Sequence, residues 1–166
     1  DDRSANRVYR APMRARDRDA SQFLGARLAV RRAISGIGDS VDATPARIED
    51  AMLDVRDAHG EKAARMLDRF ARLPEGAFVW TQTGDEEFFL GRLKGPWRYD
   101  DSEAARNSGI HHVRPTEWID PPFDLKSPPR AVIDTFARGG RNLQRIRDAD
   151  AEMRTGKLWS SCRAGG

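Results

Sequence analysis

The chain contains one cysteine, Cys162, among its 166 residues. One cysteine excludes an internal disulfide and any zinc site built from several cysteines. No apolar run approaches the roughly 20 residues that a transmembrane helix needs, so we expect no membrane partner. The first ten residues, DDRSANRVYR, lack the apolar core of a signal peptide. Together these absences predict a cytoplasmic protein.

The sequence also lacks the short motifs that mark common active sites. It has no GxSxG, no P-loop and no zinc-ligand spacing. His111, His112 and Glu117 form a candidate acid–base or metal set, but adjacent residues on a strand point to opposite faces and cannot easily bind one ion together. The run Asp124–Lys126 lacks the partners of a PD-(D/E)xK nuclease core. We therefore expect a non-catalytic protein with no cofactor and no metal, and an enzyme using the histidine pair is a weaker alternative.

Charge is abundant but nearly balanced. Lys and Arg number 29 against 26 Asp and Glu, which gives a net charge of +3. The length fits one domain with a real core. Residues 1–20 carry many charges and few apolar side chains, so we interpret them as a basic N-terminal arm with a short strand within 7–13. Residues 21–166 are then the folded domain.

The first half of that domain reads as mainly helical. Residues 22–35 predict a helix or strand leading into a strand that ends at the Gly36–Gly38 turn. A helical insert follows over about 44–73. Its first helix has Thr44 as a candidate N-cap and ends at His59–Gly60, and its second covers about 61–73.

The second half is dominated by strands. Residues 78–83 and 88–94 predict a hairpin, and residues 110–119 predict a further strand. Two helices are expected at the end, one over 130–137 with Ser127 as its cap and one over about 143–154. This order predicts an α+β fold with a small, strongly curved sheet, a partly closed barrel, and helices packed around it.

Aromatic and cationic side chains alternate along the predicted hairpin and the bend that follows it. Trp80, Trp97 and Tyr99 can offer flat faces, and Arg92, Lys94 and Arg98 lie between them. Such a surface can stack a base and hold a phosphate. Trp80 fits a core position and a pocket equally well, whereas Trp97 beside the Gly-Pro bend favours a pocket. Trp118 alternates with Val113, which favours the core.

Several of these segments resemble the EVE-like and YTH-like branch of the PUA-like superfamily. The segments are GIG at 36–38, the helical pair, GAFVWT at 76–81, FFLGRL at 88–93, WRY at 97–99 and HVRPTEW at 112–118. Their order is most similar to the N-terminal specificity modules of bacterial modification-dependent restriction systems. The resemblance covers roughly residues 27–159, and Asp39 stands where related modules often carry an aromatic residue.

The resemblance implies a PUA-like barrel that flips a modified base of DNA into an aromatic pocket. The base pocket implied in this chain comprises Trp80, Trp97, Tyr99, Asp39, Ser40 and Trp118. The residues expected at the nucleic-acid backbone are Arg92, Lys94, Arg98, Arg114, Arg138 and Arg141. A carboxylate such as Asp39 can accept a hydrogen bond from an exocyclic amine of a base.

The partners implied are modified DNA and a nuclease or motor domain or subunit of a restriction or phage-defence system. Two alternatives of other kinds stay open. One is an RNA-binding module linked to RNA modification, which structured RNA would distinguish from a modified duplex. The other is a protein-interaction domain, which would show no salt-dependent nucleic-acid binding.

Overall fold

The computed structural model describes residues 7–14, 22–140 and 142–164. This part of the chain forms a seven-stranded sheet and six helices. The strands are β1 (Val8–Arg10), β2 (Ile34–Ile37), β3 (Phe78–Gly84), β4 (Glu87–Leu93), β5 (Arg98–Tyr99), β6 (His112–Trp118) and β7 (Gln144–Arg145). The helices are α1 (Leu24–Arg32), α2 (Ile48–His59), α3 (Glu61–Arg72), α4 (Glu103–Ser108), α5 (Arg130–Ala137) and α6 (Ala149–Ala164).

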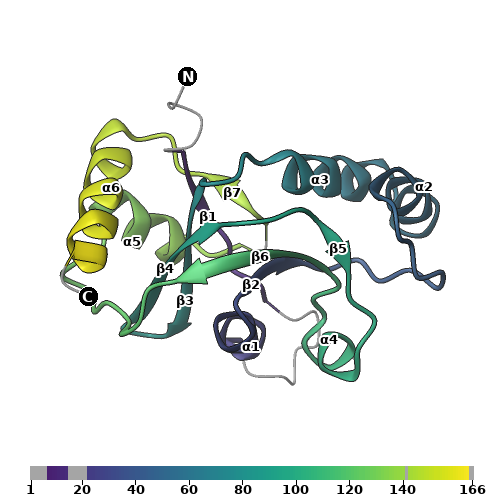
Figure 1. Ribbon diagram of the computed structural model, residues 1–166, viewed down its shortest axis with the longest axis horizontal. Coiled ribbons are helices and arrows are strands. Elements are labelled where there is room, and N and C mark those ends of the chain that lie inside the picture. Colours follow the sequence, from purple (N-terminus) through teal and green to yellow (C-terminus); the bar gives the residue numbers. More distant parts are fainter. Residues whose placement is uncertain (1–6, 15–21, 141, 165–166) are drawn as a thin grey trace.

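The sheet is mixed and curled, as Figure 1 shows. Its strand order is β2-β6-β4-β3-β1-β7, and β5 pairs with β6 beside this path. β1 runs parallel to β3, and the other pairs are antiparallel. Helices α5 and α6 cover one end of the sheet, and α2 and α3 extend from the other. The expected α+β class and curved sheet are therefore confirmed.

The predicted β3–β4 hairpin is present and divides its side chains between two cores. Phe78 and Trp80 pack with α5 and α6, whereas Val79 between them packs in a second core on the opposite face. This alternation is what the period of two along a strand requires. Phe88 and Phe89 are both buried, so neither is available on the surface.

The helical pair lies between β2 and the hairpin, as predicted, and has a small core of its own. Ala51 and Val55 of α2 pack against Ala64 and Leu67 of α3. The first helix begins at Ile48, so the predicted cap at Thr44 is wrong. The hydroxyl of Thr44 instead bonds the Asp101 carboxylate at 3.2 Å, which takes it away from the helix start.

The C-terminal region differs most from the prediction. Residues 144–145 form strand β7 on the edge of β1, and helix α6 begins only at Ala149. Asp148 supplies the start signal, since its carboxylate accepts a hydrogen bond from the Ala151 backbone N–H at 2.8 Å. Helix α5 has the predicted bounds, but its N-cap is Pro129 rather than Ser127.

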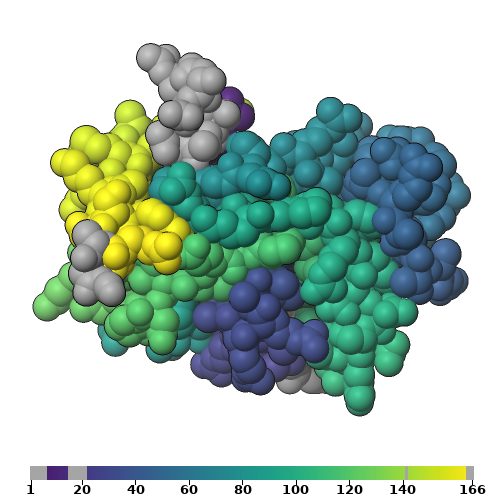
Figure 2. Space-filling view, in the orientation of Figure 1, coloured from purple at the N-terminus to yellow at the C-terminus, as the bar shows by residue number. Residues whose placement is uncertain are grey.

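The segment interpreted as a basic arm contributes to the sheet itself. Val8, Tyr9 and Arg10 are all buried between β3 and β7, which confirms the short strand and places the start of the domain inside the predicted arm. The rest of that range, 1–6 and 15–20, lies outside the described residues. In the space-filling view the α2–α3 pair and α6 form opposite ends of the molecule (Figure 2). Within the described part of the chain, no helix is long and apolar enough to cross a membrane.

Candidate functional site

A cavity of about 340 Å³ lies where the two edges of the curled sheet approach each other. We call it the edge cavity. Its walls come from the chain after β1, the end of β2, one side chain of α3, the turn before β6 and the residues before β7. The described residues that line it are Ala11, Pro12, Met13, Arg14, Gly36, Ile37, Gly38, Asp39, Met66, Gly109, Ile110, Asn142 and Leu143. Most are aliphatic, and the polar side chains are those of Arg14, Asp39 and Asn142.

Backbone strain is concentrated at this cavity. Three described residues other than glycine have a positive φ: Met13 at 52°, Ala33 at 59° and Asp39 at 74°. Ala33 simply ends α1, whereas Met13 and Asp39 both line the edge cavity. A side chain in this region costs of order 1–3 kcal/mol, and such positions cluster at ligand sites. The surrounding structure must therefore hold both residues in place.

Glycines allow the close packing that holds the Met13 side of the cavity. A Cβ added to Gly25 on α1 would lie 2.0 Å from the Met13 carbonyl oxygen. A Cβ on Gly36 would lie 2.3 Å from the side chain of Ile110, which is on the opposite wall. Any side chain at Gly25 or Gly36 would therefore push against a cavity wall.

The Asp39 side of the cavity is held by His112. The Nε2 atom of His112 donates a hydrogen bond to the Asp39 carbonyl at 2.9 Å. Its Nδ1 atom accepts one from the indole Nε1 of Trp97 at 3.1 Å. A carbonyl can only accept and an indole N–H can only donate, so this pair of bonds fixes one neutral tautomer. Burial of the ring, aided by the charges of His111 and His59, lowers the pKa of His112 to about 3.

Two further side chains hold the residues just after Asp39. The Tyr99 hydroxyl donates to the Val41 carbonyl at 3.1 Å and accepts from the Val41 N–H at 3.0 Å. The Nε2 atom of His59 donates to the Ser40 carbonyl at 2.6 Å, and its Nδ1 lies 4.0 Å from the Asp39 carboxylate. His112 and His59 thus support the backbone of this turn, and His111 stacks on the Tyr99 ring behind it.

The structure brings four of the six predicted pocket residues together, in a different arrangement from the one expected. Asp39 lines the edge cavity and Ser40 follows it, while Trp97 and Tyr99 support this turn from behind. None of the described residues that line the cavity is aromatic. The aromatic cage implied by the resemblance is therefore absent from these walls, and its tryptophan and tyrosine have a positioning role.

The other two predicted pocket residues pack into the fold, Trp80 fully and Trp118 in part. Trp80 is fully buried in the core under α6, and its indole N–H donates to the hydroxyl of Thr155 at 3.1 Å. Trp118 packs over Gly91 and donates to the Ile34 carbonyl at 3.0 Å. Each indole N–H has an internal partner, so both rings stabilise the fold and neither faces the cavity.

The predicted backbone-contact residues are scattered. Arg114 is buried and bonds the carbonyls of Phe70, Leu73 and Gly95, so its assignment to phosphate contact is wrong. Burial lowers its pKa, although Glu75 opposes the shift. Lys94 pairs with Glu117 at 3.5 Å. Arg98 is exposed near Asp100, Arg138 is exposed beyond α5, and Arg92 lies in a separate groove under α6. Arg141 lies outside the described residues.

A basic stripe on α3 adjoins the edge cavity instead. Lys62, Arg65 and Arg69 recur at spacings of three and four residues, which places them on one helix face. They line a groove of about 430 Å³, which we call the α3 groove and which shares Met66, Asn142 and Leu143 with the cavity. No acidic side chain is among its described lining residues. Sequence reasoning missed this stripe because the alternating acids and bases of the helical pair looked like ordinary solvated faces.

Arg10 is a second cation that sequence reasoning did not identify. It is buried in β1 and donates to the carbonyls of Thr135, Gly139 and Asn142 at 3.0, 2.8 and 3.2 Å. Burial, together with Arg138 and Arg14, lowers its pKa. Because Asn142 lines the cavity, the hydrogen bond from Arg10 to its carbonyl holds this part of the cavity wall in place. The arginine-rich N-terminal segment gave no signal for this role.

The histidine pair is not arranged as a metal centre. Both ring nitrogens of His112 have protein partners, and the Nδ1 atom of His111 bonds the Asp100 carbonyl at 3.0 Å. Across the described residues, no group of three or more metal-binding side chains comes together.

Comparisons with known proteins give little beyond this geometry. No family model matches the sequence, and no curated protein matches it significantly. Among solved structures, the chain is similar to the YTH domain of the Zygosaccharomyces rouxii MRB1 protein, determined in complex with N6-methyladenosine RNA. The identity is 12% and the TM-score 0.44, over 94% of this chain and 86% of that one.

Proposed function

We propose that the chain is a non-catalytic nucleic-acid-binding module that takes a modified base into the edge cavity. The observation that carries the proposal is the shape of the cavity wall: two strained residues, Met13 and Asp39, line one small hollow, Met13 packed closely against Gly25 and Asp39 held by the hydrogen bond from His112. Strained backbone lowers the stability of a protein, so its presence beside a cavity is typical of a ligand-binding site. The volume, about 340 Å³, lies at the lower end of the range of about 300–1,000 Å³ for small-molecule sites.

The chemistry of the walls suits a flat, mostly apolar ligand with one polar edge. Met13 and Met66 bring thioethers, whose contacts with aromatic rings are worth about 0.3–1.5 kcal/mol each. Flipping a base costs a few kcal/mol, which several such contacts and the burial of the ring can offset. The Asp39 carboxylate can accept from an exocyclic amine, and Asn142 can both donate and accept.

The α3 groove supplies cations beside the cavity that can contact the phosphates next to the bound base. Lys62, Arg65 and Arg69 form no ion pair with any described carboxylate, so they are available to phosphates. Phosphate contacts position the strand while the cavity reads the base. We take modified DNA as the ligand, in a restriction or defence system, on the strength of the sequence resemblance. The similar YTH domain was solved with RNA, so RNA is the comparison that the experiment must include.

The test is fluorescence anisotropy at one fixed salt concentration. Matched oligonucleotides would be unmodified, or carry 5-methylcytosine, 5-hydroxymethylcytosine or N6-methyladenine, as DNA duplexes and as single-stranded DNA and RNA. We expect about tenfold or greater preference for one modified DNA. Asp39→Asn should reduce that preference, because asparagine tolerates the left-handed backbone but presents a different hydrogen-bonding edge. Met66→Trp should weaken binding by filling the cavity.

The matched control is Asp85→Asn, which changes an exposed carboxylate at the hairpin turn that does not line the cavity. It should leave the preference intact. Equal affinity for all oligonucleotides, or an unchanged preference in Asp39→Asn, would refute the proposal. A preference for modified RNA over every DNA would replace DNA by RNA as the ligand of the same cavity.

A further inference from the structure

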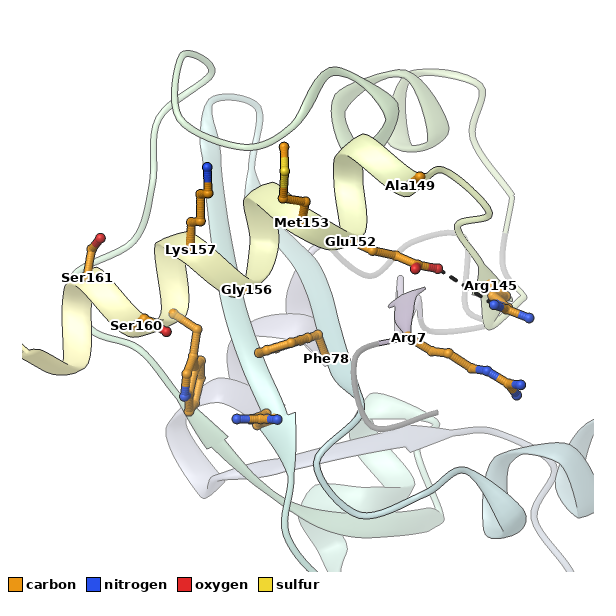
Figure 3. A pocket seen from close by; sticks show the side chains of 12 residues that line it. Arg7, Phe78, Arg145, Ala149, Glu152, Met153, Gly156, Lys157, Ser160 and Ser161 are labelled. Atoms are coloured by element: carbon orange, nitrogen blue, oxygen red, sulfur yellow. Dashed lines mark ion pairs between the residues drawn. The ribbon is translucent and has the colours of Figure 1, made fainter. Parts of the chain in front are cut away.

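A hollow larger than the edge cavity lies under α6, at the opposite end of β1. This α6 groove has a volume of about 1010 Å³. It runs between α6 and the starts of β1 and β3, and Figure 3 shows the side chains around it. Arg7 lies at its β1 end, whereas Ala11 to Arg14 at the other end of the same segment line the edge cavity.

The α6 groove is strongly cationic. Arg7, Arg92, Arg145 and Lys157 line it against one carboxylate, Glu152. Figure 3 shows Glu152 turned toward Arg145, with which it pairs at 3.6 Å. The three remaining cations have no carboxylate partner among the described residues. The groove therefore favours an anionic ligand.

Arg92 is preorganised for such a ligand. Its guanidinium lies 4.4 Å from the Phe78 ring centroid and 5.7 Å from that of Trp159. Its Nε atom donates to the Gly76 carbonyl at 2.7 Å, and its terminal nitrogens find no hydrogen-bond acceptor among the described residues. A guanidinium that is fixed through Nε and has free terminal donors matches two oxygens of a phosphate or carboxylate.

Residues 142–147 connect the α6 groove to the edge cavity. Arg145 lines both the α6 groove and a neighbouring hollow of about 620 Å³. Arg69 and Gln144 line that hollow and also the α3 groove, which shares Asn142 with the edge cavity. Successive hollows thus follow edge strand β7.

Few free acids interrupt this path. The neighbouring hollow contains Asp134 and Asp148. Asp134 pairs with Arg130 at 3.6 Å, and Asp148 caps α6. The cations along the same hollow are Arg69, Arg138, Arg145 and Arg147.

We propose that a single nucleic-acid strand, with one base in the edge cavity, continues along β7 into the α6 groove, where Arg7, Arg92 and Lys157 bind its phosphates. This inference rests on the proposed function. The aromatic rings in the groove, Phe78 and Trp159, are only 2% and 8% exposed, so the groove offers phosphate contacts without base stacking. An acidic peptide is a poorer occupant, because β7 has two residues and gives a peptide strand little to pair with.

The length of the path sets a measurable footprint. Met13 and Arg7 are six residues apart, so at roughly 3.3 Å per residue they are separated by at most about 20 Å. At about 3.4 Å per phosphate along one strand, the path takes at most about six nucleotides beyond the flipped base. Affinity should therefore rise with oligonucleotide length up to roughly that size and then level off.

The experiment measures anisotropy with unmodified single-stranded DNA of about 4, 8 and 12 nucleotides, within the usual range of site sizes. We compare wild type with the double variant Arg7→Ala/Lys157→Ala and with the control Arg31→Ala/Lys126→Ala, which removes exposed cations away from the path. Each lost contact should reduce the salt slope by about 0.7 and the affinity by about fivefold at 0.1 M salt. The affinity of the double variant should thus be about 25-fold lower for the longer strands and little changed for the shortest.

The two proposals fail in different ways. Unmodified strands carry no information on base discrimination, so a length effect lost in the double variant supports the path whether or not a modified base is preferred. An identical length series in wild type and the double variant would overturn the path and leave the cavity proposal standing. Displacement of a long strand by polyglutamate with no length effect would also overturn it, in favour of an acidic protein partner.

Discussion

Lowering the pH from 7.5 to 5.0 should remove about 2 kcal/mol of unfolding free energy through His112 alone. The pKa of His112 is lowered to about 3 in the folded protein, against about 6.5 in an unfolded chain. Between these values the unfolded state binds one proton that the folded state does not. The stabilisation is therefore fully present above pH 6.5 and is lost as the pH falls toward 3, by about 1.4 kcal/mol per unit.

The main structural cause is burial of the imidazole ring, aided by the charges of His111 and His59, and both ring nitrogens already have protein partners. A proton on Nδ1 would face the Trp97 N–H, which is itself a donor, and the ring is fully buried. His112→Phe removes the titration and Trp97→Phe removes the opposing donor. Both variants should lose stability at pH 7.5, and both should have a flatter pH profile than wild type.

The assay is urea unfolding followed by tryptophan fluorescence at several pH values between 5.0 and 7.5. Staying above pH 5 avoids the titration of Asp100, whose pKa is lowered by its hydrogen bonds to Ser102 and by Arg98 and Arg32 despite its burial. His59→Gln is the control for a partly exposed histidine at the same turn. Profiles of equal steepness in wild type, His112→Phe and Trp97→Phe would show that His112 is not held neutral.

Two substitutions test other parts of the framework. Arg114→Met should destabilise the protein by about 3 kcal/mol or more in urea unfolding, because three buried carbonyls lose their donor. The control Arg98→Met, on the surface, should cost under about 0.5 kcal/mol. An equal cost for both variants would contradict the structural role of Arg114. Gly25→Ala should destabilise the protein by about 1–3 kcal/mol and weaken binding of the preferred oligonucleotide, because the added methyl group displaces Met13. The control Gly156→Ala has open space around it and should stabilise helix α6 by about 0.5–1 kcal/mol. Gains in stability at both glycines would refute the close packing at Met13.

Local pattern accounts for much of the fold. Alternating β-formers and a Gly-Asp turn were enough to predict the β3–β4 hairpin, and helical spacing was enough for α3 and α5. The errors occurred where a local signal was ambiguous. Thr44 had the right chemistry for a cap but its hydroxyl bonds Asp101, and LQRI at 143–146 fits a helix as well as it fits strand β7.

The candidate site was predictable in composition and not in geometry. Asp39, Trp97 and Tyr99 were singled out from the sequence, and the structure does place them around one turn. Which of them faces a ligand depends on long-range contacts, because His112 and Val41 take the polar ends of the two aromatic side chains. Burial likewise made Trp80 and Arg114 internal residues, although each sits in a motif that resembles a binding surface.

The sequence by itself determined the order of the elements up to α5, the curved sheet and the helical pair, because periodicity and turn residues act over a few neighbours. The tertiary structure alone decided that the strand Val8–Arg10 lies inside the sheet between β3 and β7, that Arg10 is a buried scaffold cation, and that the edge cavity, the α3 groove and the α6 groove follow one edge of the sheet. These features join residues more than 60 positions apart. Their energies arise from desolvation and hydrogen bonds that exist only once the sheet has curled.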